Sequence, residues 1–196
     1  IVAISTVSGG SATEDGSQSV TITITENESS PTVTLATSAT SIAENSGSTL
    51  TLTATISQAA DEDVTVNLGA AGTSTNGTDY GSISSITVSA GATTGTATFD
   101  PTDDSVYEGS ETAVISISSV SGGDAVESGS QSVTITITDN ESAPTVTLAV
   151  SATSIAENAG SSLTLTATLS GTTDSDITVA LDTSGAATEG TDYTDG

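Results

Sequence analysis

Apolar and polar residues alternate with a period of two along most of this chain. In the segment Leu50–Ile56, the residues Leu, Leu, Ala and Ile occupy every second position and Thr fills the positions between them. Such alternation predicts a β-strand with one face toward a core and the other toward water. It predicts strands over 33–35 with 41–43 (one broken strand), and over 50–56, 64–68, 83–88, 94–99, 113–118 and 133–137.

The alternation also indicates how these strands are assembled. No stretch shows the 3.6-residue period of an amphipathic helix. Short strands separated by turn residues, seven in about 110 residues, are typical of an immunoglobulin-like antiparallel β-sandwich. Val, Ile and Leu are expected to face the core, and Thr the solvent. Thr suits these exposed strand positions because its branched side chain favours extended backbone. We therefore predict an all-β fold.

The sequence repeats itself without gaps at an offset of 113 residues. Of the 83 overlapping positions, 55 are identical; residues 17–25, for example, return as 130–138, and Gly77–Tyr80 return as Gly190–Tyr193. A match of this length predicts a tandem array of similar domains. Its phase divides the chain into the C-terminal part of one repeat (1–29), one complete repeat (30–142) and the N-terminal part of the next (143–196).

The charge of the chain is entirely one-sided. It contains 25 Asp and Glu residues and no Lys, Arg or His, which gives a formal net charge of −25. Clustered carboxylates in a folded protein must be protonated, hydrated or matched by a cation, and this chain supplies no cation of its own. A charge of this sign argues against nucleic acid and anionic membrane surfaces as partners.

Several other functions are disfavoured by the composition. Without Cys, no disulfide can stabilise the predicted small cores, and a bound metal is a common substitute. Without His, Cys or Lys, the usual general bases and nucleophiles of enzymes are missing, so we do not expect an enzyme. No run of about 18 apolar residues is present, so we expect no membrane insertion in this segment.

The acidic residues of the complete repeat fall in loops that such a sandwich brings together at one end. Glu44 follows the first strand, Asp79 lies between the third and fourth, residues 103–111 join the fifth to the sixth, and residues 139–141 follow the last. Seven carboxylates are then within reach of one another: Glu44, Asp79, Asp103, Asp104, Glu108, Asp139 and Glu141. For any single acid, the alternative interpretation is a hydrated surface charge.

Calcium is the cation that suits this set of donors. Ca²⁺ takes six to eight oxygen ligands and tolerates irregular geometry, whereas zinc prefers His and Cys. Seven carboxylates exceed the needs of one ion, so the sequence leaves room for two or more Ca²⁺ ions to share this end of the repeat.

Four sequence motifs resemble the Calx-beta family of calcium-binding domains, which occurs in sodium–calcium exchangers and in extracellular adhesins and matrix proteins. These motifs are Glu44–Gly47, the Gly-Thr-Asp-Tyr segment Gly77–Tyr80, the acidic segment Asp103–Glu111, and the closing segment Ile137–Glu141. The resemblance covers the complete repeat, and fragments of it occur in both partial repeats.

The resemblance implies particular calcium ligands. They are side-chain oxygens of the seven carboxylates above and the backbone carbonyl of Val106. Asn140 lies within the acidic segment 139–141 that follows the last strand, and it replaces one acid of the family pattern. Ser105 replaces another acid. These differences leave the number of bound ions open. The partial repeats keep Glu26, Asn27 and Glu28 and, in the last one, Glu157 and Asp192; each would need its missing loop to complete a site.

These features favour a structural function. Nearly identical repeats are interchangeable, as expected for units that extend or stiffen an array. We expect a calcium-stiffened repeat segment of an extracellular or cell-surface adhesin, matrix or filament protein. Its expected partners are neighbouring repeats, and identical chains in a filament or matrix are further candidates. The alternatives are a cell-adhesion module that binds a glycan or a protein, and a calcium-sensing regulatory domain.

The partial repeats at the two ends leave two arrangements open. The chain can be an interior piece of a longer array, or neighbouring chains can complete each other's partial repeats. The second arrangement lacks a stretch equivalent to residues 84–113, which counts against simple completion.

Overall fold

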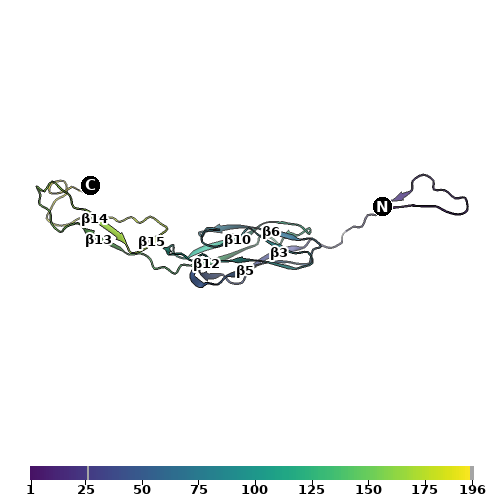
Figure 1. Ribbon diagram of the computed structural model, residues 1–196, viewed down its shortest axis with the longest axis horizontal. Coiled ribbons are helices and arrows are strands. Elements are labelled where there is room, and N and C mark those ends of the chain that lie inside the picture. The colour runs from purple at the N-terminus through teal and green to yellow at the C-terminus, as the bar shows by residue number, and fades with distance from the viewer. Residues whose placement is uncertain (26, 195–196) are drawn as a thin grey trace. The chain divides into compact units, whose positions relative to one another are not determined.

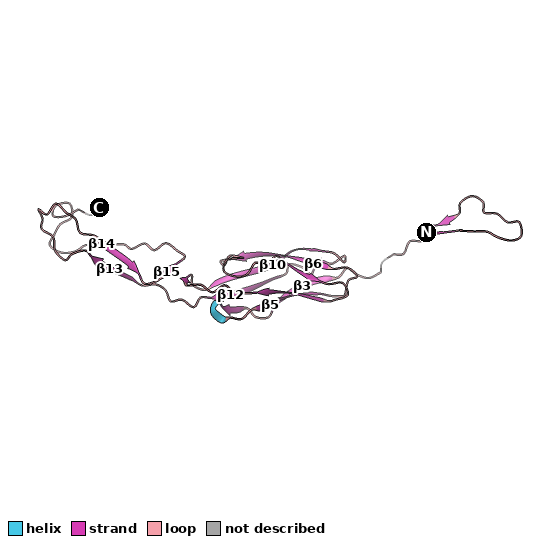
Figure 2. Cartoon of the chain, in the orientation of Figure 1, coloured by secondary structure: helices cyan, strands magenta, loops and turns pink. Residues whose placement is uncertain are grey.

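The computed structural model describes residues 1–25 and 27–194 (Figure 1). Within these ranges the regular elements are strands, apart from one short 3₁₀ turn, η1 (Glu44–Ser46), as Figure 2 shows. The predicted all-β fold is confirmed. The chain forms two compact units, residues 1–30 and 31–196, which are described separately. Glu26 lies outside the described residues.

The first unit is a single pair of short strands. Strand β1 (Val2–Ala3) pairs antiparallel with β2 (Ser19–Val20), and Val2 lies opposite Val20. Its apolar side chains are largely exposed: Val20 and Ile22 each keep 64% of their surface accessible. The strand pair therefore forms without a buried core of its own.

The second unit contains a two-sheet sandwich. One sheet has the order β4 (Ser41–Ala43), β12 (Ser132–Thr138), β10 (Glu111–Ser121), β6 (Val64–Gly72), β7 (Ser85–Val88). The other has the order β11 (Val126–Glu127), β3 (Thr32–Thr37), β5 (Leu50–Ile56), β8 (Thr94–Phe99). Most neighbours are antiparallel, but β4 is parallel to β12 and β11 is parallel to β3.

Two features of this sandwich differ from the strand pattern read from the sequence. The expected broken first strand is shared between the sheets, because β3 pairs with β5 whereas β4 pairs with β12. Two strands of two residues each, β11 and β9 (Val106–Tyr107), lie where no alternation is visible. A strand of two residues is too short to show a period, so pairing with a neighbour is its only signal.

Side chains from both sheets meet in one aliphatic core. In β5, Leu50, Leu52, Ala54 and Ile56 are buried while Thr51 and Thr55 are exposed, so the alternation predicts the buried face correctly. The largest core residues are Tyr80 and Phe99, which are fully buried and stack with ring centroids 4.6 Å apart. Tyr80 is thus a packing residue and is inaccessible to a ligand.

The last part of the chain forms the hairpin of β13 (Val146–Val150) and β14 (Leu165–Leu169), with the same register as β3 and β5. Val146 lies opposite Leu169, as Val33 lies opposite Ile56 113 residues earlier. Local sequence therefore sets the pairing in both copies. Among the described residues no second sheet covers this later hairpin, and Leu165 remains 54% exposed where Leu52 is fully buried.

We expect Phe99→Ala to destabilise the sandwich by about 3–5 kcal/mol, because it removes a buried ring and the stacking partner of Tyr80. Urea unfolding would measure the loss of free energy. Thr98→Ala is the control, since Thr98 is the exposed neighbour in the same strand and its loss should cost less than about 1 kcal/mol. Equal losses for the two variants would contradict this assignment of the core.

Candidate metal centre

Four segments of the sandwich converge at one end because of the strand directions. Turn η1 follows β4, the loop 73–84 leaves the end of β6, the segment 100–110 leads into the start of β10, and residues 139–141 leave the end of β12. We call this region the acidic end. It contains the carboxylates of Glu44, Asp79, Asp104, Glu108, Glu111, Asp139 and Glu141.

The first carboxylate group consists of Glu44, Asp139 and Glu141. One oxygen of each lies within 4.8 Å of the others. Glu44 is only 7% exposed, and its Oε1, like Oε2 of Glu141, is buried without a hydrogen-bond partner. A buried carboxylate oxygen that lacks a partner is costly. A bound cation would supply the missing interaction.

Asp139 connects this group to the neighbouring loop. Its Oδ2 accepts hydrogen bonds from the N–H groups of Glu108 (2.8 Å) and Gly109 (2.6 Å), and its Oδ1 accepts one from Glu141 (2.8 Å). Burial by itself would raise the pKa of Asp139, but these N–H donors lower it overall. Asp139 is therefore a fixed negative charge that holds residues 108–109 against the segment that follows β12.

The second carboxylate group consists of Asp79, Glu108 and Glu111, again with one oxygen of each within 4.8 Å of the others. Asp79 is fixed by its turn: its Oδ2 accepts the N–H of Thr75 at 2.5 Å, and its own N–H donates to the carbonyl of Thr75 at 3.0 Å. Gly77 enables this turn with a φ of +87°. The loop therefore cannot move Asp79 away from its neighbours without breaking the turn.

The core aromatic pair positions the same loops. Tyr80 follows Asp79 directly and forms a bridge with Pro101, just beyond Phe99. Gly81 donates to the carbonyl of Asp100 at 2.8 Å, and Thr102 donates to the carbonyl of Asp79 at 2.9 Å. Packing in the core thus determines where the second carboxylate group lies.

Burial, and secondarily the neighbouring carboxylates, raise the pKa of three glutamates at the acidic end. Burial raises the pKa of Glu44 to about 7, with further contributions from the neighbouring carboxylate of Glu141 and the charge of Asp139. Burial also raises the pKa of Glu111 to about 7, assisted by Asp79, and raises that of Glu108. These shifts mean that the acidic end favours protons or another cation near neutral pH.

Five of the residues predicted from the sequence fall within the two groups, and the structure places the other four differently. Asp104 is near both groups, since its charge raises the pKa of Glu44 and of Glu108. Val106 is the first residue of β9, and its N–H donates to Oδ1 of Asp104 at 2.7 Å. Asn140 is exposed and donates to Oε1 of Glu141 at 2.8 Å. Asp103 is exposed and belongs to neither group.

Glu111 is a site candidate that the sequence analysis left out. It ends the acidic segment 103–111, which the sequence analysis placed in the loop before the sixth strand, but it was not counted among the seven carboxylates. The structure begins β10 at Glu111 and pairs Ala113 with Gly72 of β6. That pairing brings Glu111 to the loop that carries Asp79, and its place in the acidic motif Asp103–Glu111 is the sequence signal that could have identified it.

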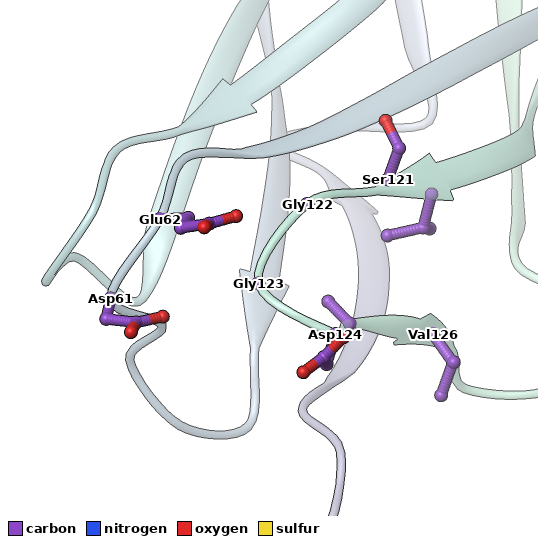
Figure 3. A pocket seen from close by; sticks show the side chains of 9 residues that line it. Asp61, Glu62, Ser121, Gly122, Gly123, Asp124 and Val126 are labelled. Carbon is purple, nitrogen blue, oxygen red and sulfur yellow. The ribbon is translucent and has the colours of Figure 1, made fainter. Parts of the chain in front are cut away.

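The opposite end of the sandwich has a hollow of a different kind. β10 runs from the acidic end to Ser121, where residues 120–126 and the loop with Asp61 and Glu62 line an open pocket (Figure 3). A Cβ on Gly122 would lie 2.1 Å from the carbonyl oxygen of Asp63, so only glycine allows the two loops to approach this closely. Within the described residues no third group of clustered carboxylates occurs there.

Comparisons with known proteins match two families. Residues 31–140 match the LapA domain, and residues 139–196 match the Calx-beta domain. The resemblance to the Calx-beta family is therefore confirmed, although the family match over the complete repeat is to the LapA domain. A comparison with curated protein sequences gave no match.

Three similar solved structures come from Calx proteins. The apo-form Calx CBD1 domain is 18% identical with a TM-score of 0.46, and the match covers 56% of this chain and 99% of that one. CBD12 from CALX1.2 is 20% identical (TM-score 0.44; 52% and 41% covered). The calcium binding domain CBD12 of CALX1.1 is also 20% identical (TM-score 0.43; 51% and 42% covered). The chain thus spans less than half of each CBD12 structure.

Among the described residues, no helix has the length and apolar character needed to cross a membrane.

In the presence of a chelator, we expect stability to fall as pH rises from 5 to 8. Glu44 and Glu111 have folded-state pKa values of about 7, above the ordinary 4.5, so the folded chain binds more protons than the unfolded chain in this interval. The stabilisation by these extra bound protons is therefore fully present below pH 4.5 and is lost as the pH rises through about 7. Urea unfolding in EDTA should show a loss on the order of 1–3 kcal/mol.

Glu44→Gln should reduce this pH dependence, because glutamine cannot titrate. Glu62→Gln is the matched control: Glu62 is exposed and lies in the loop at the opposite end of the sandwich. A wild-type chain whose stability rises with pH in EDTA would contradict the expectation.

Proposed function

Because the chain belongs to the LapA domain family through residues 31–140 and matches the Calx-beta family beyond them, we propose that it is a calcium-stiffened structural segment of an extracellular or cell-surface protein. The proposed protein is an adhesin, a matrix protein or a surface filament built from tandem 113-residue repeats. The observation that carries this proposal is the buried, unpartnered Oε1 of Glu44 within a group of carboxylates, in a chain without any basic residue.

The donors at the acidic end suit calcium. All available side-chain donors are oxygens, and Ca²⁺ accepts six to eight of them in flexible geometry. Glu44, Asp139 and Glu141 would hold one ion, and Asp79, Glu108 and Glu111 a second; the charge of Asp104 acts on both groups. Bound Ca²⁺ would neutralise these carboxylates and join four segments of the chain at one point.

A mechanical function agrees with the repetition of the sequence. A stiffening element needs the same bond at each junction, and the acidic exit 139–141 directly precedes the short link Ser142–Pro144 to the next repeat. Neighbouring repeats are therefore the proposed partners, and identical chains in a filament or matrix are further candidates. A calcium-sensing regulatory domain remains the second candidate, because the Calx-beta match suits it equally well.

A module that binds a glycan or a protein receives less support. Aromatic side chains on loops often form such binding surfaces. Tyr80, beside the acidic motif, is fully buried against Phe99 and cannot contact a ligand.

We expect millimolar Ca²⁺ to raise the midpoint of thermal unfolding of the 196-residue chain by several degrees at pH 7.5. When the free Ca²⁺ concentration is 100 times the dissociation constant of a site, binding adds about 2.7 kcal/mol to the free energy of unfolding. Differential scanning calorimetry with Ca²⁺ and then with EDTA would measure the shift. Glu44→Gln should lose much of it and Glu62→Gln none. A midpoint unaffected by Ca²⁺ would refute the proposal.

Two adjacent aspartates provide a finer test of the ligand set. We expect Asp104→Asn to weaken Ca²⁺ binding by roughly tenfold or more, since the affinity of such sites depends on the number of charged ligands. Asp103→Asn should have a smaller effect, because Asp103 lies in neither carboxylate group. Titration calorimetry would measure both affinities. Equal losses would identify Asp103 as a ligand as well.

A further inference from the structure

The first unit and the β13–β14 hairpin each expose a set of apolar side chains. In the first unit, Val20, Ile22 and Ile24 keep 64%, 64% and 93% of their surface accessible. In the hairpin, Leu148 and Leu165 keep 56% and 54%. Contiguous apolar surface of this kind marks a contact with another protein surface more often than it marks free surface.

The complete repeat shows what covers the equivalents of both sets. The offset of 113 residues makes Ile22 the equivalent of Ile135 in β12. The same offset makes Leu165 the equivalent of Leu52 in β5. Ile135 and Leu52 are fully buried, and they belong to opposite sheets of one core. The two exposed faces are thus equivalents of two surfaces that bury each other in the complete repeat.

Both strand pairs already have the register that this packing needs. Val2 lies opposite Val20 in the first unit. Their equivalents, Ile115 and Val133, form the same pair in the complete repeat. The register of β13 with β14 likewise equals that of β3 with β5. Docking would therefore require no change of register in either pair, which lowers its entropic cost.

The order of the strands in the sheets removes the objection that the sequence raised against such completion. Residues 1–29 and 143–196 together match the whole repeat except the stretch equivalent to 84–113. In the complete repeat this stretch supplies β7 and β8, each the last strand of its sheet, together with β9 and the start of β10. The strands that remain are adjacent: β4, β12, β10 and β6 in one sheet, and β11, β3 and β5 in the other. Only one flank of the sandwich would be missing.

Charge also favours contact at these faces over contact elsewhere. The chain contains 25 acidic residues and no basic residue. None of the acids lies in residues 1–8, 19–25, 146–150 or 165–169. Two copies of the chain repel each other over most of their surfaces, so they can approach most closely at these uncharged strands.

We propose that residues 1–25 of one copy dock on the β13–β14 face of a second copy, so that one sandwich forms from two chains. Residues 2–8 would pair with residues 178–183 as β10 pairs with β6, which adds backbone hydrogen bonds to the apolar contact. Each copy contributes two different surfaces, so the contact is heterologous and builds an open head-to-tail row of copies.

This association is expected to be reversible, because the shared sandwich has no equivalent of the buried Phe99. It does not require Ca²⁺ at the acidic end, so it can hold or fail separately from the proposed function.

Sedimentation velocity of the full 196-residue chain in EDTA, at physiological ionic strength and increasing concentration, tests the proposal. We expect species of two, three and more copies, whose share rises with concentration. Ile22→Asp and Leu165→Asp should each leave the chain monomeric, because docking would bury an unpaired carboxylate.

An equimolar mixture of these two variants provides the sharper test. Leu165→Asp still supplies an intact first unit and Ile22→Asp an intact hairpin, so the mixture should form dimers and nothing larger. Thr21→Asp and Thr166→Asp are the matched controls, since they add the same charge beside Ile22 and Leu165. Their equivalents, Thr134 and Thr53, lie outside the core, so both controls should assemble like the wild type.

Three results would overturn the inference. A wild-type chain that stays monomeric at every concentration would show that the faces do not associate. Large species formed by Ile22→Asp or Leu165→Asp alone would show unspecific aggregation. A mixture that contains only monomers would show that the two faces do not recognise each other. None of these results bears on the Ca²⁺-induced rise in the unfolding midpoint, which tests the proposed function independently.

Discussion

Repulsion among carboxylates that have no internal counter-charge is the constraint on which the acidic end depends. Two groups of three carboxylates each hold one oxygen per residue within 4.8 Å of the others. At such distances, like charges repel strongly where water is partly excluded. The loops would separate if they were free to do so, but Asp139 bonds to the N–H groups of Glu108 and Gly109, and Asp79 is fixed by its turn. Protons relieve the repulsion at low pH, and a divalent cation would relieve it at neutral pH.

The rigidity that keeps these charges close originates in the core. Tyr80 and Phe99 are the largest fully buried side chains, and each is followed by backbone bonds that join the loops of the second carboxylate group. The remaining core is almost entirely aliphatic, so this stacked pair provides an unusually specific contact in a sandwich that is otherwise built from Val, Ile, Leu and Ala. Stability of the core and geometry of the site are therefore coupled through the same two residues.

Much of this arrangement follows from the sequence by simple physical rules. Period-two alternation locates the main strands and their buried faces, as in Leu50–Ile56, because successive side chains of a strand point to opposite faces and apolar ones favour the buried face. It cannot assign partners, and so it merges β3 with β4 although they belong to different sheets. β9 was missed for the same reason, because this two-residue strand is defined by its pairing with β15 (Thr172–Thr173), which is distant in the sequence.

The last part of the chain, residues 146–193, separates what local sequence determines from what the complete sandwich adds. The hairpin of β13 and β14 keeps the register of β3 and β5, and Thr188 donates to Asp192 as Thr75 donates to Asp79. Hairpin register and the Asp-bearing turn are therefore local properties that each copy carries by itself. Burial of Glu44 and convergence of the two carboxylate groups require both sheets. A site assembled in this way is absent from the unfolded chain, so any ion that binds it adds its binding free energy to folding.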